Sequence, residues 1–233
     1  MRSAVVLLSG GLDSATCLAW ARREGYSAHA LTVDYGQRHA IEIERAAVLA
    51  RGLGAASHRI LAVDLSFLAG SALTDRNVAV PKTRSPVEIG SGVPTTYVPA
   101  RNTVLLALAL AWSESLGARD LVIGVNAVDY SGYPDCRPAF IRAFSRMARF
   151  ATRSGVEGGR VRIHTPLIRR SKADIVRTGT RLGVDFRRTT SCYDPDRRGR
   201  ACGRCAACRI RRKGFADAGM PDVTFYRVPQ RTT

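Results

Sequence analysis

Apolar and polar residues alternate between two kinds of stretch along this chain. Short runs rich in Val, Ile, Leu and Ala are typical of strands covered on both faces, and they lie at residues 4–8, 28–33, 59–63, 121–125 and 161–164. Elsewhere the apolar residues recur with a helical period, which predicts helices over 14–23, 41–53, 103–116, 139–153 and 172–182. Ser171 and Asp174 form a capping pattern at the start of the last helix.

Five alternations of a strand with a helix predict an α/β fold, a Rossmann-like doubly wound parallel sheet. Ligands of such sheets bind beyond the carboxyl ends of the strands, where the winding reverses. We therefore expect residues 9–14, 34–36 and 126–136, which follow three of the strands, to converge. The connection over 66–101 contains four prolines and no strong period, as is typical of lids, binding loops or disordered segments.

The residue pattern changes near the C-terminus. From residue 186 onward, cysteines and arginines replace the apolar pattern of the preceding strands and helices. We expect an α/β nucleotide-binding domain over 1–185, followed by a small cysteine-rich, zinc-binding segment over 186–233.

A glycine-rich turn joins the first predicted strand to the first predicted helix. Residues 9–14 read SGGLDS, so backbone N–H groups and serine hydroxyls meet at the positive end of a helix dipole, which is a site for phosphate. Asp13 repels an anion, and we expect it to hold Mg²⁺ or to shape the turn. The lysine of a P-loop NTPase does not follow. The segment instead resembles the pyrophosphate loop of the PP-loop ATP pyrophosphatases, and the predicted ATP-binding residues are Leu7, Leu8, Ser9, Gly10, Gly11, Leu12, Asp13, Ser14, Ala15, Thr16 and Cys17.

The charge of the chain is strongly positive, at +17 over 233 residues. Basic surfaces attract nucleic-acid backbones. Only three of the 36 basic residues are lysines, however, so 36 minus 3 leaves 33 arginines, and the basic stretch over 197–213 lacks interleaved aromatic residues for stacking on bases. We expect a solvated, anion-attracting surface and no direct nucleic-acid binding; a polynucleotide site is the alternative.

The longest apolar run, residues 104–112, is far shorter than the roughly 20 residues that span a bilayer. The N-terminus begins with a strand pattern and shows no signal-peptide pattern. We expect a cytoplasmic protein with no membrane association.

Four cysteines near the C-terminus are spaced C-x9-C-x2-C-x2-C, at Cys192, Cys202, Cys205 and Cys208. This spacing favours a Cys₄ site for one structural Zn²⁺, and four protein ligands leave no position open for chemistry. An Fe–S cluster, a redox pair and disulfides are the alternatives, of which a cytoplasmic location disfavours disulfides.

The chain resembles one family over nearly its whole length, the 7-cyano-7-deazaguanine (preQ0) synthases of queuosine biosynthesis. The motifs that carry the resemblance are VVLLSGGLDS (5–14), DYGQRH (34–39) with Glu42, VP (98–99), RN (101–102), GVNA (124–127), DYSGYPDCR (129–137), TPL (165–167) with Lys172, SCY (191–193) and CGRCAAC (202–208). One departure is Ala100, which stands where the family pattern has glycine.

The resemblance implies an ATP-dependent ligase that converts 7-carboxy-7-deazaguanine and ammonia to the nitrile, with Mg²⁺ accompanying ATP. Transfer of AMP to the carboxylate oxygen supplies a leaving group, ammonia gives the amide, and a second activation of the amide oxygen gives the nitrile. The resemblance also suggests a homodimer. The ammonia source stays open, as does the choice between AMP with pyrophosphate and ADP with phosphate as products.

The resemblance also suggests which residues act. Asp13, Arg101 and Lys172 are the candidate catalytic residues, and the candidate substrate contacts are Arg101, Tyr130, Tyr133 and Asp135. For Arg101 and Lys172 the alternative is a surface salt bridge, and for residues 131–134 it is a simple tight turn. The roles of Gln37, Arg38 and His39 stay open between an ammonia gate, a ribose contact and, for His39, a helix cap.

Two rival functions remain. A tRNA-modifying PP-loop enzyme would carry sulfur on a reactive thiol, for which Cys136 between an acid and Arg137 is the candidate. We expect instead a packing or substrate-contact role for Cys136. A non-catalytic zinc module would bind nucleic acid through the arginine-rich stretch, with an affinity that depends on salt.

Overall fold

Five parallel strands form a single sheet in this computed structural model, which describes residues 2–38, 41–82, 92–128 and 132–227. The strands are β1 (Ser3–Leu7), β2 (Ser27–Asp34), β3 (Ser57–Ala62), β4 (Asp120–Val122) and β5 (Arg162–His164), in the order β3-β2-β1-β4-β5. Winding therefore reverses between β1 and β4. The predicted doubly wound α/β fold is confirmed.

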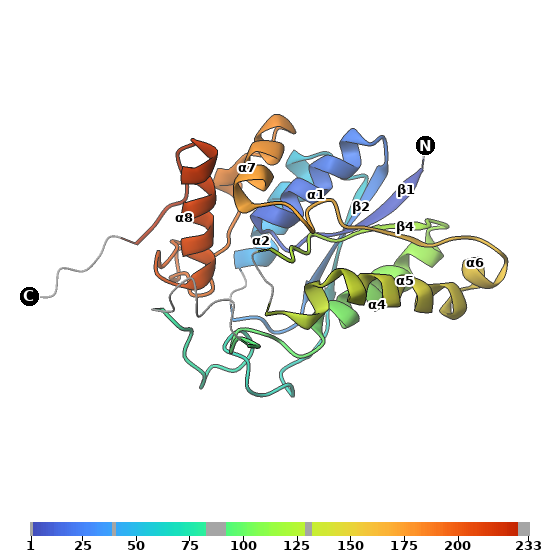
Figure 1. Cartoon of the computed structure of the whole chain (residues 1–233), viewed down its shortest axis with the longest axis horizontal. Coiled ribbons are helices and arrows are strands. Elements are labelled where there is room, and N and C mark those ends of the chain that lie inside the picture. Colours follow the sequence, from blue (N-terminus) through green and yellow to red (C-terminus); the bar gives the residue numbers. More distant parts are fainter. Residues whose placement is uncertain (1, 39–40, 83–91, 129–131, 228–233) are drawn as a thin grey trace, which may run out of the picture.

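Helices cover both faces of this sheet (Figure 1). On one face α1 (Leu12–Arg23), α2 (Ile41–Gly52) and α7 (Lys172–Arg181) pack on Ala4, Val6 and Leu8 of the first strand and the turn after it. On the other face α4 (Arg101–Ser115) and α5 (Pro138–Ala151) pack on Val5 and Leu7. Alternate residues of β1 thus serve two separate cores, as expected for a strand buried on both sides. The remaining elements are α6 (Arg153–Val156), α8 (Ala206–Ala218) and the 3-10 turns η1 (Pro134–Cys136) and η2 (Phe186–Arg188).

Most predicted elements agree with the structure to within about two residues at each end. The largest difference is β4, which ends at Val122, three residues before the predicted end. Gly124 lies where a Cβ atom would be 3.2 Å from the backbone of Asp13 and Ser14. The chain leaves the sheet there because it passes against the glycine-rich turn.

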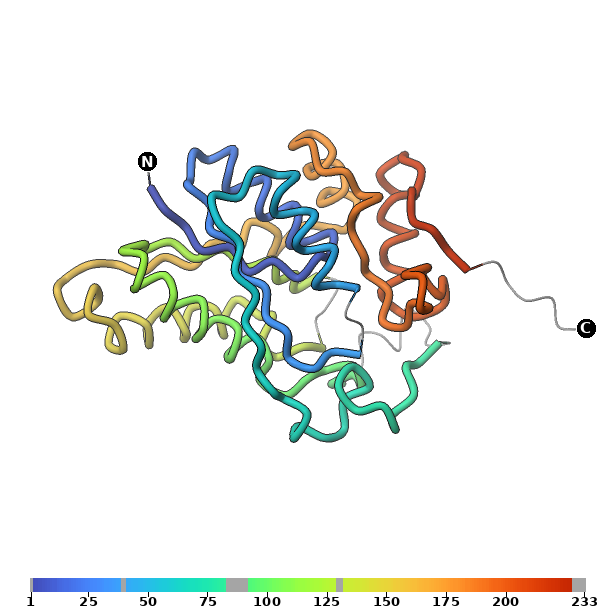
Figure 2. The backbone as a smooth tube through the Cα atoms, turned by 180° about the vertical axis from the view of Figure 1, so that it is seen from behind, coloured from blue at the N-terminus to red at the C-terminus, as the bar shows by residue number. Residues whose placement is uncertain are grey.

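Helix α8 is not predicted by the sequence pattern, although it packs side by side with α7 (Figure 2). Its buried residues recur at helical spacing, but they include Arg211 and Gly214 among Ala207, Cys208 and Phe215. A charged residue and a glycine on the buried face hide the apolar period that signals an amphipathic helix.

The long connection after β3 packs against the cysteine-rich segment. Ala72 and Val80 share a small apolar core with Cys192, Cys205 and Cys208, and Lys82 forms an ion pair with Asp194. In the described part of the chain, no helix is both long and apolar enough to cross a bilayer.

Candidate active site

A cavity of about 240 Å³ lies at the carboxyl ends of the strands, between β1 and β4. Residues from the glycine-rich turn, from the segment after β2 and from the segment after β4 line it together, so the predicted convergence is confirmed. Its lining also includes residues that the sequence did not suggest, Thr190 before the cysteine-rich cluster and Ala207, Ile210 and Arg211 of α8.

The glycine-rich turn presents the open end of α1 to this cavity. Gly11 caps the helix without a side-chain hydrogen bond, so the first N–H groups of α1 are available to an anion. The Ser9 backbone N–H donates to Ser14 Oγ at 3.1 Å, which tightens the turn. Gly10 has a φ of +83°, and a Cβ there would lie 2.3 Å from the Glu42 carbonyl oxygen. Only glycine fits at this position, because a side chain would meet both strain and backbone.

Seven of the eleven predicted ATP-binding residues line the cavity: Leu7, Leu8, Ser9, Gly11, Leu12, Asp13 and Ser14. Gly10 packs against the backbone of α2. Ala15, Thr16 and Cys17 continue α1 with buried side chains. Their contribution to nucleotide binding stays a prediction.

Asp13 and Lys172 form an ion pair across the cavity wall. Lys172 Nζ donates to both Asp13 carboxylate oxygens at 2.8 Å, and Lys172 is only 8% exposed. The alternative of a surface salt bridge therefore does not describe Lys172. Helix α8 packs closely against the Lys172 side chain: a Cβ on Gly214 would lie 2.3 Å from Lys172 Cγ.

Arg101 is a half-buried cation that begins α4 and lines the cavity. Its Nη1 donates to the Tyr35 hydroxyl at 3.4 Å, and among the described residues its buried Nε has no hydrogen-bond partner and its guanidinium no carboxylate within ion-pair distance. Burial alone would lower its pKa, but Tyr35 and Asp135 raise the pKa of Arg101 above its ordinary value. The side chain stays charged and suits a planar anion such as a carboxylate.

Ala100, where the family resemblance leads us to expect glycine, directly precedes Arg101 in the sequence. Ala100 caps α4 with φ 50° and ψ 23°, and it is the one non-glycine residue of the described chain with positive φ. Glycine adopts this conformation without the steric cost that a Cβ brings. A glycine at this position would avoid that cost.

The segment before α5 fixes the start of α4. Asp135 Oδ2 accepts from the Asn102 backbone N–H at 2.9 Å, and Asn102 Nδ2 donates to Cys136 Sγ at 3.4 Å. Asp135 is buried and does not line the cavity, whereas Tyr133 lines it and shares a 2.6 Å hydrogen bond with Thr96. Substrate contacts of Tyr133 and Asp135 stay predictions. Tyr130 and His39 lie outside the described residues.

Cys136 lines the cavity as a neutral thiol. Burial and the nearby Asp135 raise the pKa of Cys136 to about 11. A sulfur carrier needs a thiolate near neutral pH, which requires a lowered pKa. The geometry therefore favours packing or substrate contact over sulfur transfer.

Glu42 is a functional candidate to which the sequence assigned no role. It lies in the first turn of α2 and lines the cavity. Burial raises the pKa of Glu42 to about 7, and Arg101 opposes that shift. The sequence signal that could have identified Glu42 was its position shortly after the second strand, beside the DYGQRH motif (34–39). Gln37 and Arg38 also line the cavity, and Gln37 Oε1 accepts from the Tyr35 N–H at 2.8 Å.

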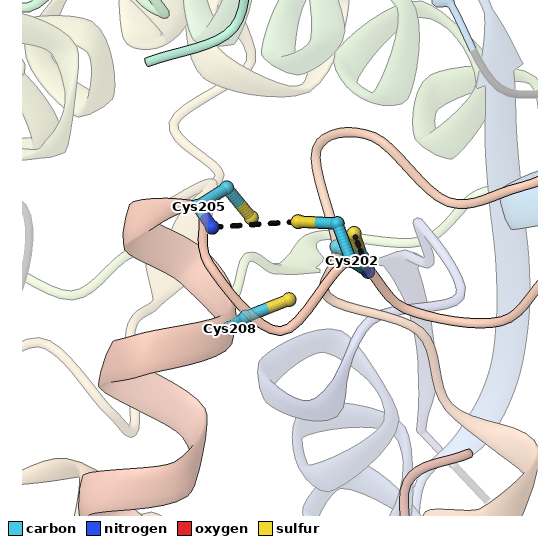
Figure 3. A group of neighbouring side chains, drawn as sticks. Cys202, Cys205 and Cys208 are labelled. Carbon is cyan, nitrogen blue, oxygen red and sulfur yellow. Dashed lines mark hydrogen bonds between the residues drawn. The ribbon is translucent and has the colours of Figure 1, made fainter. Parts of the chain in front are cut away.

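The four C-terminal cysteines form a candidate metal centre. Their sulfur atoms all lie within 4.8 Å of one another, and Figure 3 shows Cys202, Cys205 and Cys208 directing their sulfurs to one point. The N–H of Cys202 donates to Cys192 Sγ at 3.1 Å and the N–H of Cys205 to Cys202 Sγ at 3.4 Å. Such bonds stabilise thiolates, the form that binds metal. All six cysteines of the chain are described, and none forms a disulfide.

The parallel sheet, the glycine-rich turn and the cavity at the winding reversal together define an α/β fold of the PP-loop type. A sequence profile of the family described as "Queuosine biosynthesis protein QueC" matches residues 3–219. The chain belongs to this family.

Curated relatives agree with this assignment, and a solved structure shares the fold. The chain is 67% identical to a 7-cyano-7-deazaguanine synthase of Anaeromyxobacter sp. (strain Fw109-5), over 97% of this chain and 96% of that protein. It is 65% identical, with the same coverage, to one of Anaeromyxobacter dehalogenans (strain 2CP-C). The structure of NMN synthetase from Francisella tularensis shares the fold, with a TM-score of 0.50 and 16% identity over 94% of this chain and 78% of that one.

Proposed function

We propose that this protein is an ATP-dependent ligase that converts 7-carboxy-7-deazaguanine and ammonia to 7-cyano-7-deazaguanine. The observation that carries the proposal is one cavity in which the glycine-rich turn, the Asp13–Lys172 pair and the half-buried Arg101 meet. A donor-rich turn suits the polyphosphate of ATP, and a half-buried cation lacking a carboxylate partner within the described chain suits an acid substrate. The identity to curated synthases supports the specific substrate.

A carboxylate is a poor electrophile, and its oxygen is a poor leaving group. In this proposal Arg101 aligns the carboxylate so that one oxygen attacks the α phosphorus of ATP, which gives an acyl adenylate and pyrophosphate. The N–H groups of the turn and Lys172 offset the charge on the phosphates. Lys172 does this from the start of α7, where Gly214 of α8 packs closely against its side chain.

Ammonia then displaces AMP to give the amide. Attack of the amide oxygen on a second ATP, followed by loss of AMP, gives the nitrile. One site serves both stages because each begins with an oxygen attacking an α phosphorus. The neutral Cys136 thiol in the same cavity argues against the rival sulfur transfer.

Two metal ions complete the proposal. Asp13 is a carboxylate beside the phosphate turn, and together with phosphate oxygens it fits Mg²⁺, which neutralises developing charge. Cys192, Cys202, Cys205 and Cys208 fit one Zn²⁺, which stabilises the cysteine-rich segment and performs no chemistry.

The proposed assembly rests on family membership, whereas the proposed location and domain division rest on the sequence pattern. We propose a cytoplasmic enzyme that acts as a homodimer on small molecules. We also propose that residues 1–185 form the nucleotide-binding unit and 186–233 the zinc-binding segment.

The direct test is incubation of the protein with ATP, Mg²⁺, ammonium and 7-carboxy-7-deazaguanine, with the nitrile followed by mass spectrometry. Wild-type protein should form nitrile, and Arg101→Met should lose roughly 10²- to 10³-fold in turnover because one charged donor is removed. Arg101→Lys should recover part of that loss. A folded, zinc-loaded wild-type protein that forms no nitrile would refute the proposal.

A further inference from the structure

We propose that Glu42 is a catalytic proton acceptor that turns ammonium into ammonia in the active-site cavity. This inference rests on the proposed function and adds a residue to it. It concerns the step after adenylation, when nitrogen attacks the activated carbon.

Glu42 lies near both the glycine-rich turn and Arg101. Its backbone carbonyl contacts the glycine-rich turn, because a Cβ on Gly10 would be 2.3 Å away, and its side chain lines the cavity. Arg101, which lines the same cavity, is the residue whose charge acts on the Glu42 carboxylate. If Arg101 binds the reacting carboxylate, Glu42 lies at the reacting end of the substrate and beside its phosphate donor.

The Glu42 carboxylate is uncommitted. No described residue forms a hydrogen bond or ion pair with its side chain in this structure, although Arg101 is near enough to influence it. A carboxylate in a cavity with no fixed cation of its own is suited to a small cation such as ammonium.

Other groups in the cavity are unsuited to accept a proton. Both Asp13 oxygens accept from Lys172, Cys136 is a neutral thiol, and burial raises the pKa of Tyr35 and Tyr133 above their ordinary values. The other titratable and charged groups that line the cavity with Glu42 are Asp13, Tyr35, Arg38, Arg101, Tyr133, Cys136, Lys172, Tyr193 and Arg211, and Glu44 and Arg45 lie on its own helix.

The chemistry needs such a group. Ammonium predominates over ammonia at neutral pH and has no lone pair with which to attack. A general base works best when its pKa lies near the working pH, and burial brings the pKa of Glu42 to about 7. A solvated glutamate, with a pKa of about 4.3, would be a weaker base.

Attack by nitrogen transfers one proton to Glu42 and releases AMP. The Glu42 carboxylate takes one proton from ammonium and becomes the neutral acid, which frees the nitrogen lone pair. That lone pair forms the C–N bond, and the C–O bond to AMP breaks with its electron pair leaving on AMP. One further proton passes from the nitrogen to solvent as the amide forms, and Glu42 returns its own proton to solvent before the next turn.

The test separates adenylation from attack by nitrogen, using Glu42→Gln. Exchange of labelled pyrophosphate into ATP, with 7-carboxy-7-deazaguanine and no ammonium, reports adenylation; nitrile formation at pH 7 reports the whole reaction. We expect exchange within about threefold of wild type and nitrile formation lowered roughly 100-fold or more, the scale of lost general-base catalysis. Hydroxylamine, which is largely unprotonated at pH 7, should restore product formation as the hydroxamate.

Glu44→Gln is the matched control. Glu44 is an exposed carboxylate in the same helical turn and does not line the cavity, so both rates should match wild type. The wild-type rate of nitrile formation should rise with pH up to about 7, because only the ionised carboxylate accepts a proton. Glu42→Gln should lose that acid limb.

Each other result decides against the inference. Nitrile formation within threefold of wild type in Glu42→Gln would exclude a base at this position. Equal loss of exchange and nitrile formation, with a raised KM for the acid substrate, would assign Glu42 to substrate recognition instead. Absence of both exchange and nitrile in wild-type protein would refute the proposed function itself and this inference with it.

Discussion

The two walls of the cavity are built in opposite ways. One wall is the glycine-rich turn over residues 9–14, which is continuous in sequence and offers backbone N–H groups. The other wall brings Tyr35, Glu42 and Arg101 together from three elements and offers charged or polar side chains. A backbone wall suits phosphate, a group common to all nucleotides, whereas side-chain charges in the cavity suit one particular acid and one particular nucleophile.

This difference predicts different sensitivities. The backbone wall should fail when a turn can no longer adopt its shape, whatever the charge of the new residue. The side-chain wall should fail when a charge changes, even if the shape is kept. Four predictions test this contrast, in order of decreasing effect.

Gly10→Ala should have the largest effect. The new Cβ would lie 2.3 Å from the Glu42 carbonyl at a φ of +83°, so the turn must open, and we expect turnover to fall on the order of 10³-fold as phosphate donors are displaced. Steady-state kinetics and nucleotide titration measure this. Gly25→Ala is the control, because Gly25 has a φ of +80° with open space around it. Similar losses of turnover in both variants would show that strain alone, and not the contact with α2, matters.

Cys205→Ser should be next, because α8 contributes to the lining of the cavity. Cys205 caps α8, which carries Ala207, Ile210 and Arg211 to the cavity. Structural zinc stabilises the folded state directly, so the free energy of unfolding should fall by at least about 3 kcal/mol. Metal analysis and chemical denaturation should show zinc and stability falling together. Full stability in a zinc-free variant would separate this segment from the integrity of the site.

Glu42→Gln should change the pH dependence of stability more modestly. The native pKa of about 7 lies above the ordinary 4.5, so between these values the folded wild-type protein binds more protons than the unfolded chain, and its stability falls as pH rises. The Glu42→Gln variant has no titratable group at this position, so its stability does not have this dependence on pH. Its melting temperature relative to wild type should therefore increase from pH 5 to pH 8 in protein without ligands. A constant difference across that range would show that Glu42 is solvated in the folded state.

Ala100→Gly should have the smallest effect, a gain of about 0.5 to 1 kcal/mol in the free energy of unfolding, because glycine relieves left-handed strain. The position caps α4 directly before Arg101, so turnover should change little if the arginine is already correctly placed. Urea denaturation measures the gain. A loss of stability would mean that the entropy of the unfolded glycine variant outweighs the strain in this alanine.

Short-range patterns in the sequence were enough to predict much of this protein. The apolar run of β1 and the SGGLDS turn depend on neighbouring residues, since strand burial, backbone freedom and helix capping act within a few positions. The Ser171 cap was predicted in the same way, and Ser171 Oγ accepts from the Asp174 N–H at 3.1 Å. The spacing of the four cysteines likewise predicted the cluster that the fold assembles.

Long-range contacts decided the rest. The pairing of Asp13 with Lys172 joins residues 159 positions apart, and the buried face of α8 carries Arg211, whose partners Thr189 and Asp222 come from other segments. Glu42 resembles any acidic residue in the first turn of a surface helix. It gains its raised pKa only because distant segments enclose it, and desolvation is a property of the packed structure and not of the sequence around a residue.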